Sequence, residues 1–194
     1  MAIITLVGPR SVGKSTVGKN LASSLGYKYV NTDEVMDKKW EKQGGIGKYT
    51  TKYGWDSYYK QLNNYFRRNL DSFKKEKGVI LDCGGGTIYS EFPGSRLNAK
   101  LLKGNSKIVL ILPDQDLEKG YEILFERERK RPHFKTWDPK KLKSKVVEDY
   151  KSRVPGMLEY ADHVVHADQN SPEKLAKLIE ACVNKSQNSK NPKR

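Results

Sequence analysis

The chain has 194 residues with 37 basic and 23 acidic side chains, which leaves a formal net charge of +14. This length favours one domain, and a hydrophobic share of 36% with 3 Trp, 11 Tyr and 5 Phe excludes general disorder. The longest uninterrupted apolar run, residues 108–112, is far shorter than the roughly 20 residues of a membrane span, and the first residues lack the basic start of an export signal. We therefore expect a cytoplasmic protein with no membrane partner.

Short apolar runs alternate with helical patterns along the chain. The expected strands are residues 3–7, 27–30, 79–81 and 108–112. The expected helices are residues 17–25 before Gly26, residues 55–77, and two that begin after Asp138-Pro139 and Ser171-Pro172. Strands separated by helices predict a three-layer α/β fold with a central parallel sheet. We assign residues 1–183 to one domain and residues 184–194 to a flexible basic tail.

A glycine-rich segment stands between the first expected strand and helix. Residues 8–15 read GPRSVGKS, which matches the P-loop pattern G-x-x-x-x-G-K-[ST]. In such a loop the backbone N–H groups surround a polyphosphate, Lys14 reaches its outer oxygens, and Ser15 offers a hydroxyl to Mg²⁺. A chance glycine-rich turn is the alternative, but the flanking strand and helix favour nucleotide binding. The predicted contacts are Gly8, Ser11, Val12, Gly13, Lys14, Ser15 and Thr16. A P-loop does not identify the reaction.

Three further segments are candidates for a second ligand. Asp33 follows the second expected strand, and the third strand ends in Asp82 and the run Gly84 to Gly86; two arginines, Arg131 and Arg153, precede or nearly precede prolines further along. The carboxyl ends of parallel strands meet at one edge of a sheet. We therefore expect Asp33 and the glycine run to face the P-loop.

Together these segments resemble the shikimate kinases, over roughly residues 2–183. The markers are GPRSVGKST at 8–16, NTD at 31–33, ILDCGGGTI at 80–88, KRP at 130–132, RVP at 153–155 and DQNSP at 168–172. The resemblance implies a P-loop kinase fold with a mobile lid at about 127–140. It also implies that ATP and Mg²⁺ are used to phosphorylate the 3-hydroxyl of shikimate, a step of aromatic amino-acid biosynthesis.

The same resemblance implies roles for individual residues. Asp33 would bond the acceptor hydroxyls and take the proton. The backbone of Gly84, Gly85 and Gly86 would hold the shikimate carboxylate together with Arg153. Arg131 would close over the phosphates and, with Lys14, stabilise the charge that develops in transfer, and the DQNSP loop would surround the adenine. Asp82 lies in the position of a Walker B carboxylate and, with Ser15, is the candidate Mg²⁺ site.

Each role has a simpler alternative. Asp33 could cap a helix over residues 34–40, and the three glycines could form only a flexible turn. Arg131 and Arg153 could be solvated charges on a basic segment. Asp82 could be a solvated residue at a strand end.

The chain also departs from the family pattern. Asn31 stands where an aspartate is usual, and Ser11 stands where a glycine is frequent. Tyr58-Tyr59 replaces a Phe-Arg pair, so Tyr59 occupies the slot of an arginine that pairs with the substrate carboxylate. A neutral phenol cannot make the bidentate ionic contact of a guanidinium. Charge could be restored from the same helix by Lys60, Arg67 or Arg68.

Two rival functions remain open at this point. One is a related P-loop kinase for gluconate or another small hydroxy acid, which Tyr59 favours. The other is a nucleic-acid-binding protein switched by nucleotide, which the charge of +14 suggests. The basic residues show no aromatic-interleaved RNA-binding motif, so we expect no specific nucleic-acid partner and a monomer.

Overall fold

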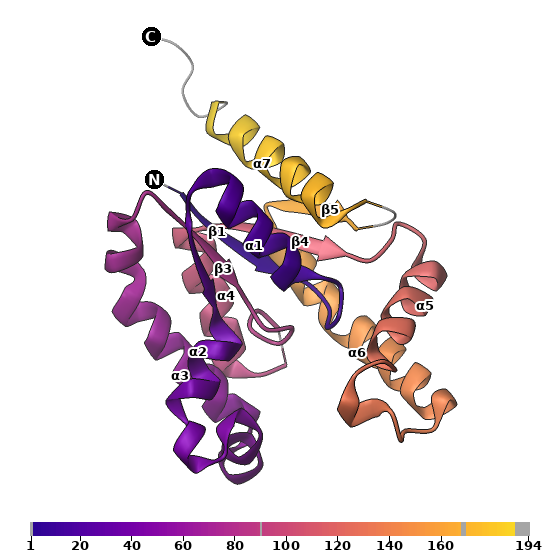
Figure 1. Cartoon of the computed structure of the whole chain (residues 1–194). Coiled ribbons are helices and arrows are strands. Elements are labelled where there is room, and N and C mark those ends of the chain that lie inside the picture. The colour runs from indigo at the N-terminus through magenta and orange to yellow at the C-terminus, as the bar shows by residue number, and fades with distance from the viewer. Residues whose placement is uncertain (1, 90, 168–169, 189–194) are drawn as a thin grey trace.

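Five parallel strands form the centre of the fold in the order β2-β3-β1-β4-β5 (Figure 1). The computed structural model describes residues 2–89, 91–167 and 170–188. The strands are β1 (Ala2–Val7), β2 (Lys28–Asn31), β3 (Gly78–Asp82), β4 (Lys107–Leu112) and β5 (His163–His166). The predicted α/β class with a parallel sheet is confirmed. The sequence patterns did not indicate β5, which is a short edge strand.

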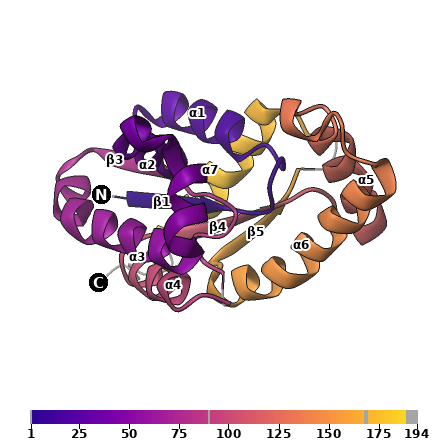
Figure 2. The ribbon, with the colours of Figure 1, turned by 90° about the horizontal axis from the view of Figure 1, so that it is seen from below.

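Helices cover both faces of the sheet (Figure 2). One face carries α1 (Lys14–Leu25) and α7 (Pro172–Asn188), which pack on each other. The other face carries α3 (Gly45–Lys75), α4 (Pro93–Asn105) and α6 (Pro139–Tyr160). The shorter α2 (Thr32–Lys39) packs on α3, and α5 (Leu117–Glu128) packs on α6. This arrangement is the expected three-layer fold, with α4 and α5 as helices that the sequence reading did not include.

The predicted helix boundaries hold where a side chain or a glycine sets them. Asp138 caps α6 by accepting a hydrogen bond from the Lys141 backbone N–H at 2.9 Å. Gly26 ends α1 in the left-handed conformation, with a φ of 63°. At the other end of the chain, α7 runs to Asn188, past the predicted domain boundary at residue 183, and residues 189–194 of the predicted tail lie outside the described residues.

Helix α3 starts earlier than expected and is broken at Gly54. The φ of 80° and ψ of 162° at Gly54 are not helical, so residues 45–53 and 55–75 form two segments. The second segment is the helix that the sequence predicted. Its residues Tyr58, Leu62 and Phe66 are buried, as the helical period predicted.

The strand register brings the chemically important segments to one edge. Asn31 pairs with Asp82 in the β2–β3 ladder, and Asp82 pairs with Leu6 in the β1–β3 ladder. The segments that follow β1, β2 and β3 therefore leave the sheet side by side. They are the P-loop, the start of α2 and the glycine run.

Within residues 2–89, 91–167 and 170–188, no helix has both the length and the hydropathy that crossing a membrane requires.

Candidate active site

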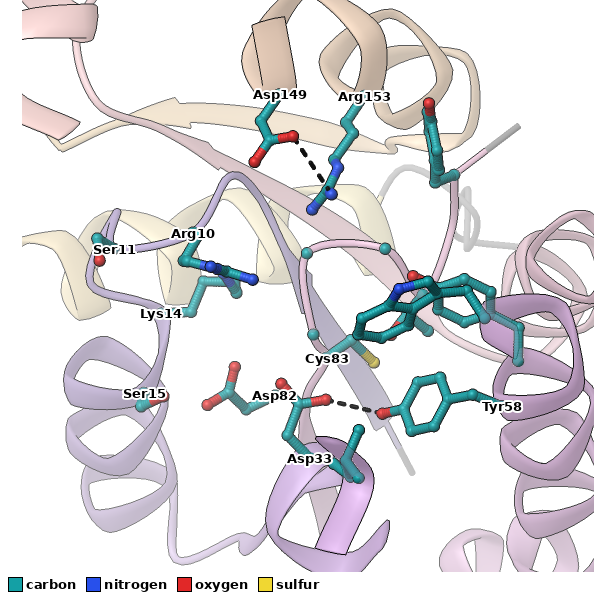
Figure 3. Close-up of a pocket in the computed structure, with 18 of the residues that line it drawn as sticks. Arg10, Ser11, Lys14, Ser15, Asp33, Tyr58, Asp82, Cys83, Asp149 and Arg153 are labelled. Carbon is teal, nitrogen blue, oxygen red and sulfur yellow. Dashed lines mark hydrogen bonds and ion pairs between the residues drawn. The ribbon is translucent and has the colours of Figure 1, made fainter. Parts of the chain in front are cut away.

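A cavity of about 880 Å³ opens at the carboxyl edge of the sheet. Its walls come from the P-loop, the start of α2, α3, the glycine run, the end of α5 and α6. The predicted site residues in these walls are Ser11, Gly13, Lys14, Ser15, Thr16, Asp33, Tyr59, Asp82, Gly84, Gly85, Gly86, Arg131 and Arg153. Gly8 and Val12 lie outside the walls. Their carbonyl oxygens accept hydrogen bonds from the side chains of Lys14 and Arg127. The fold thus brings together segments that are far apart in sequence (Figure 3).

The P-loop lysine is held by the loop itself. Lys14 Nζ donates hydrogen bonds to the carbonyl oxygens of Gly8 and Pro9, each at 3.0 Å. Removal from water by the surrounding protein lowers the pKa of Lys14, while the carboxylates of Asp82 and Asp33 act in the opposite direction. The ammonium group therefore lies in the cavity wall close to two acidic side chains. Phosphate oxygens bound by the loop could replace the carbonyl oxygens as its hydrogen-bond acceptors.

The end of α5 fastens the P-loop through contacts that the sequence reading did not predict. Ser11 has a φ of 62°, and its hydroxyl donates to Oε1 of the buried Glu128 at 2.6 Å. Arg127 Nη1 donates to the carbonyl oxygens of Ser11 at 3.2 Å and Val12 at 2.8 Å. Arg127 and Glu128 belong to a continuous run of charged residues, 126–131, so the sequence alone does not show that these two contact the P-loop.

Oxygen donors suited to a hard cation gather beside Lys14. Asp82 is 3% exposed, and its Oδ2 accepts hydrogen bonds from the Tyr29 hydroxyl at 2.7 Å and the Asn31 amide at 3.5 Å. Ser15 lines the same wall. The alternative of a solvated strand-end residue is therefore wrong for Asp82. One carboxylate and one hydroxyl fit Mg²⁺, which takes most of its remaining ligands from water and phosphate.

Asp33 projects into the cavity from the first turn of α2. It does not cap that helix, because Asn31 does: the Asn31 side-chain oxygen accepts from the backbone N–H groups of Asp33 at 3.0 Å and Glu34 at 3.1 Å. The Asp33 carboxylate instead accepts a hydrogen bond at Oδ1 from the Tyr58 hydroxyl at 3.0 Å.

The surroundings of Asp33 raise its pKa above the ordinary value for an aspartate. Solvent reaches the side chain through the cavity mouth, yet the cavity walls enclose it, and the resulting loss of hydration raises the pKa of Asp33. The Tyr58 hydrogen bond and the charge of Lys14 lower that pKa in part. A carboxylate with a raised pKa, close to where a hydroxyl group would lie, is suited to accept a proton.

Two of the three glycines make room for particular side chains. A Cβ on Gly84 would lie 2.5 Å from Asp33 Oδ1, and a Cβ on Gly86 would overlap the Tyr59 hydroxyl. A Cβ on Gly85 would meet only ordinary contacts, the nearest being the Gly8 carbonyl oxygen at 3.5 Å. The run is therefore more than a flexible turn: its outer glycines allow two site residues to approach the backbone.

The wall that would face a substrate carboxylate is mainly aromatic. Tyr59 is 6% exposed and packs with Trp55 and Phe92, with ring centroids 6.0 and 5.6 Å away. Burial raises the pKa of Tyr59 to about 12, so the phenol is neutral. Arg153 supplies a guanidinium on this side; it pairs with Asp149 at 3.5 Å and lies 5.8 Å from the Tyr89 ring centroid.

The three basic residues of α3 that could have replaced the missing arginine do not line the cavity. Lys60 pairs with Asp56 at 2.7 Å, and Arg67 donates to Asn63 at 2.9 Å. Arg68 is exposed, and none of the three belongs to the described walls. None of the three restores the charge in the cavity, because these side chains lie on other faces of α3.

Two further guanidinium groups face the cavity. Arg131 is 43% exposed at its side chain and lies 3.8 Å from Glu128 Oε1, so it stands at the entrance within the predicted lid segment. Arg10 belongs to the P-loop and was not predicted as a site residue. Figure 3 shows its side chain directed into the cavity beside Lys14. Loss of hydration raises the pKa of Asp33 and of Tyr59, and the positive charge of Arg10 offsets a part of each rise. Two residues of the predicted adenine loop, Asp168 and Gln169, lie outside the described residues.

The sequence was compared with those of known proteins. A family model described as "Shikimate kinase" matches residues 10–184. A shikimate kinase of Vibrio parahaemolyticus is 28% identical over 176 residues, which covers 91% of this chain and 92% of the relative. A pentafunctional AROM polypeptide of Kluyveromyces lactis is 34% identical over 121 residues, which covers 62% of this chain and 7% of that protein.

Solved structures show the same fold. A shikimate kinase from Acinetobacter baumannii in complex with shikimate has a TM-score of 0.66 at 23% identity and covers 96% of this chain and 94% of its own. A shikimate kinase from Bacteroides thetaiotaomicron has a TM-score of 0.74 at 19% identity, with coverages of 94% and 98%.

Proposed function

The chain belongs to the shikimate kinase family, and we propose that it is an ATP- and Mg²⁺-dependent phosphotransferase that phosphorylates the 3-hydroxyl of shikimate. One observation carries the proposal. Asp33, the glycine run and Arg153 share one cavity with Lys14 of the P-loop, although these residues come from four separate segments of the chain. A hydroxylated acid held by the first three would lie beside the phosphates held by the P-loop.

The residues of the cavity divide the phosphoryl transfer among them. Asp33 accepts the proton of the acceptor hydroxyl while the hydroxyl oxygen bonds to the γ-phosphorus. The bond from the γ-phosphorus to the bridging oxygen breaks, and ADP leaves with that electron pair. Lys14 and Arg131 neutralise the charge on the phosphoryl oxygens, and Ser15 and Asp82 would hold Mg²⁺, which supplies further neutralisation when bound. Transfer of this kind depends on positioning and electrostatics more than on covalent catalysis.

The acid group of the substrate has two cationic partners in this proposal. Arg153 reaches the space in front of the glycine run, since its Nη1 would lie 3.8 Å from a Cβ placed on Gly85. Arg10 contributes a second positive charge from the P-loop side of the same space. The pair compensates in charge for the neutral phenol of Tyr59, with a different geometry.

The test is an ADP-release assay on the purified chain with a panel of small hydroxy acids. We expect a rate with shikimate and Mg²⁺·ATP that is well above the hydrolysis seen without an acid. If shikimate gives only the background rate while another acid of the panel is phosphorylated, the substrate assignment is wrong and the kinase assignment stands.

A second candidate is a kinase for another hydroxy acid, such as gluconate. The observation that favours it is Tyr59, which is buried in the cavity wall at the position of the usual arginine. The same panel separates the two candidates, because a polyol acid would then give the higher kcat/KM.

Two finer expectations stay predictions. We expect a monomer, which sedimentation would test, and no specific nucleic-acid partner. Any retention of nucleic acid through the basic surface should fall linearly with salt on logarithmic axes.

A further inference from the structure

Helix α3 presents two adjacent phenols to the acceptor side of the cavity. Tyr58 and Tyr59 stand where the resemblance has a phenylalanine and an arginine, and both line the walls. Tyr59 fills the space left by Gly86. Tyr58 reaches the reacting groups through its hydroxyl, which is a group that phenylalanine lacks.

The contact of Tyr58 is with the proton acceptor itself. Its hydroxyl donates to Asp33 Oδ1 at 3.0 Å, and Figure 3 shows this bond crossing from α3 to the start of α2. The bond joins residues that are 25 positions apart. It is therefore made by the packing of two helices and not by local chain geometry.

The Tyr58 ring is well placed to hold its hydroxyl still. Tyr58 is 3% exposed, and its ring centroid lies 5.6 Å from that of Trp55 in an edge-to-face contact and 5.2 Å from that of Tyr59. Trp40 packs on a further side with centroids 6.0 Å apart. A ring fixed by three aromatic neighbours gives the hydroxyl a defined position.

The Asp33 carboxylate needs such a partner. Gly84 lies against this carboxylate but has no side chain to restrain its rotation. The hydrogen bonds of the Asn31 side chain hold the backbone of the first turn of α2 and do not involve the carboxylate of Asp33. The bond at Oδ1 is what sets the direction of Oδ2.

We propose that Tyr58 is a positioning residue, whose hydroxyl fixes Asp33 Oδ1 so that the second carboxylate oxygen faces the acceptor hydroxyl. This inference rests on the proposed function, since it assigns Tyr58 to the proton transfer of that reaction. Tyr58 takes no part in holding the nucleotide, and its loss acts on the chemical step.

The test is the variant Tyr58→Phe, which keeps the ring and removes only the hydroxyl. We expect kcat with shikimate to fall about tenfold, as for a lost hydrogen bond to a charged group, with KM for ATP unchanged. Tyr49→Phe is the matched control, because the Tyr49 hydroxyl makes a hydrogen bond with Ser57 Oγ at 3.0 Å across the break in α3 and Tyr49 lies outside the cavity walls. Its kcat should stay within twofold of the wild type.

A double variant shows whether Tyr58 acts through Asp33. In the Asp33→Asn background, Tyr58→Phe should cause no further fall in the residual rate. If Tyr58→Phe folds with the wild-type circular dichroism spectrum and keeps the wild-type kcat, the proposal is wrong. The same conclusion follows if Tyr58→Phe lowers kcat tenfold in both backgrounds.

A failure of the proposed function would give a different result from a failure of the Tyr58 proposal. In that case the wild-type chain gives no shikimate-dependent ADP release, before any variant is compared. If another acid of the panel is the substrate, the same variants measured with that acid confirm or overturn the role of Tyr58.

Discussion

The nucleotide side and the acceptor side of the cavity are built in different ways. The P-loop is one unbroken segment, residues 8–15, and its key contacts stay within the loop or come from the end of α5. The acceptor side combines the start of α2, the glycine run, α3 and α6. On this side the chain departs from the family pattern at Tyr58 and Tyr59 of α3 and at Asn31, which caps α2, while Asp33, the glycines and Arg153 match the resemblance.

Loss of the P-loop lysine should have the largest effect. Lys14→Ala removes the ammonium group that neutralises charge on the transferred phosphoryl group, and we expect kcat to fall on the order of 10³-fold or more. The exposed Lys38→Ala, on α2, is the control and should leave kcat unchanged. A fall of less than tenfold in Lys14→Ala would show that the nucleotide side does not depend on this residue.

Asp33→Asn tests the chemical centre of the acceptor side. We expect kcat to fall on the order of 10²-fold, with little change in ATP binding. In the wild type, kcat should be lost on acidification around a pKa above the ordinary aspartate range, because loss of hydration raises the pKa of Asp33. A pH profile that is flat down to ordinary aspartate values would argue against Asp33 as the proton acceptor.

Asp33→Asn should lower kcat without lowering the stability of the fold. A carboxyl group with a raised pKa in the folded state binds its proton more tightly there than in the unfolded chain. Its contribution to folding is therefore most favourable at low pH and is lost as pH rises through the raised pKa. At neutral pH the uncharged amide of Asp33→Asn avoids this cost, so thermal unfolding should show a Tm no lower than that of the wild type. A Tm several degrees lower would contradict this interpretation.

The glycine run can be tested position by position. Gly84→Ala places a methyl group 2.5 Å from Asp33 Oδ1 and should lower kcat on the order of tenfold to a hundredfold by displacing the carboxylate. Gly85→Ala meets only ordinary contacts in the ligand-free protein, so it should leave Tm unchanged and raise mainly the KM for the acid. Equal kcat values for the two variants would show that the run is only a turn.

Substitutions of Arg153 and Tyr59, the residues beside the substrate carboxylate, should change the kinetics less than those of the glycine run. Arg153→Ala should raise the KM for the acid about tenfold and change kcat little, as expected for a lost ionic contact in the ground state. Tyr59→Phe keeps the packing and should change KM by less than Arg153→Ala. An unchanged KM in Arg153→Ala, measured in the ADP-release assay, would place the carboxylate elsewhere.

Ser11 is expected to give the smallest effect. Ser11→Gly and Ser11→Ala both lose the hydrogen bond to Glu128, but only glycine adopts a φ of 62° without strain. We expect Ser11→Ala to be less stable than Ser11→Gly by about 1 kcal/mol in chemical unfolding. Equal stabilities would show that the left-handed conformation costs little here.

Most of the fold and most of the cavity could be predicted from the sequence, because the residues that identify the site come directly after strands in the chain. The P-loop, Asp33 and the glycine run all leave the carboxyl edge of a parallel sheet, and that placement needs only the order of strands and helices. Helix α3 was harder to place. The break at Gly54 determines where the second segment starts and which of its residues face the cavity, and the backbone angles at a single glycine cannot be read from hydrophobic periodicity.

Contacts between distant segments account for the other omissions. The bond from Tyr58 to Asp33 joins two helices, and those from Arg127 and Ser11 join the P-loop to the end of α5. Each depends on tertiary packing, and the residue types alone gave several equivalent partners. The capping role of Asn31 was missed for a different reason: Asn31 stands where the resemblance has an aspartate, and the lost carboxylate drew attention away from the amide oxygen, which accepts hydrogen bonds at the start of α2.

The phenol of Tyr59 has a practical consequence for inhibitors. Because its pKa is raised to about 12, the Tyr59 side chain stays uncharged throughout the physiological range. It offers a hydrogen bond where an arginine would make an ionic contact, and Arg153 and Arg10 supply the positive charge on this side of the cavity. A competitive inhibitor in which a neutral carboxamide replaces the acid group should therefore lose less affinity for this enzyme than for relatives that have an arginine at this position. Such compounds would discriminate between enzymes that share the same nucleotide loop.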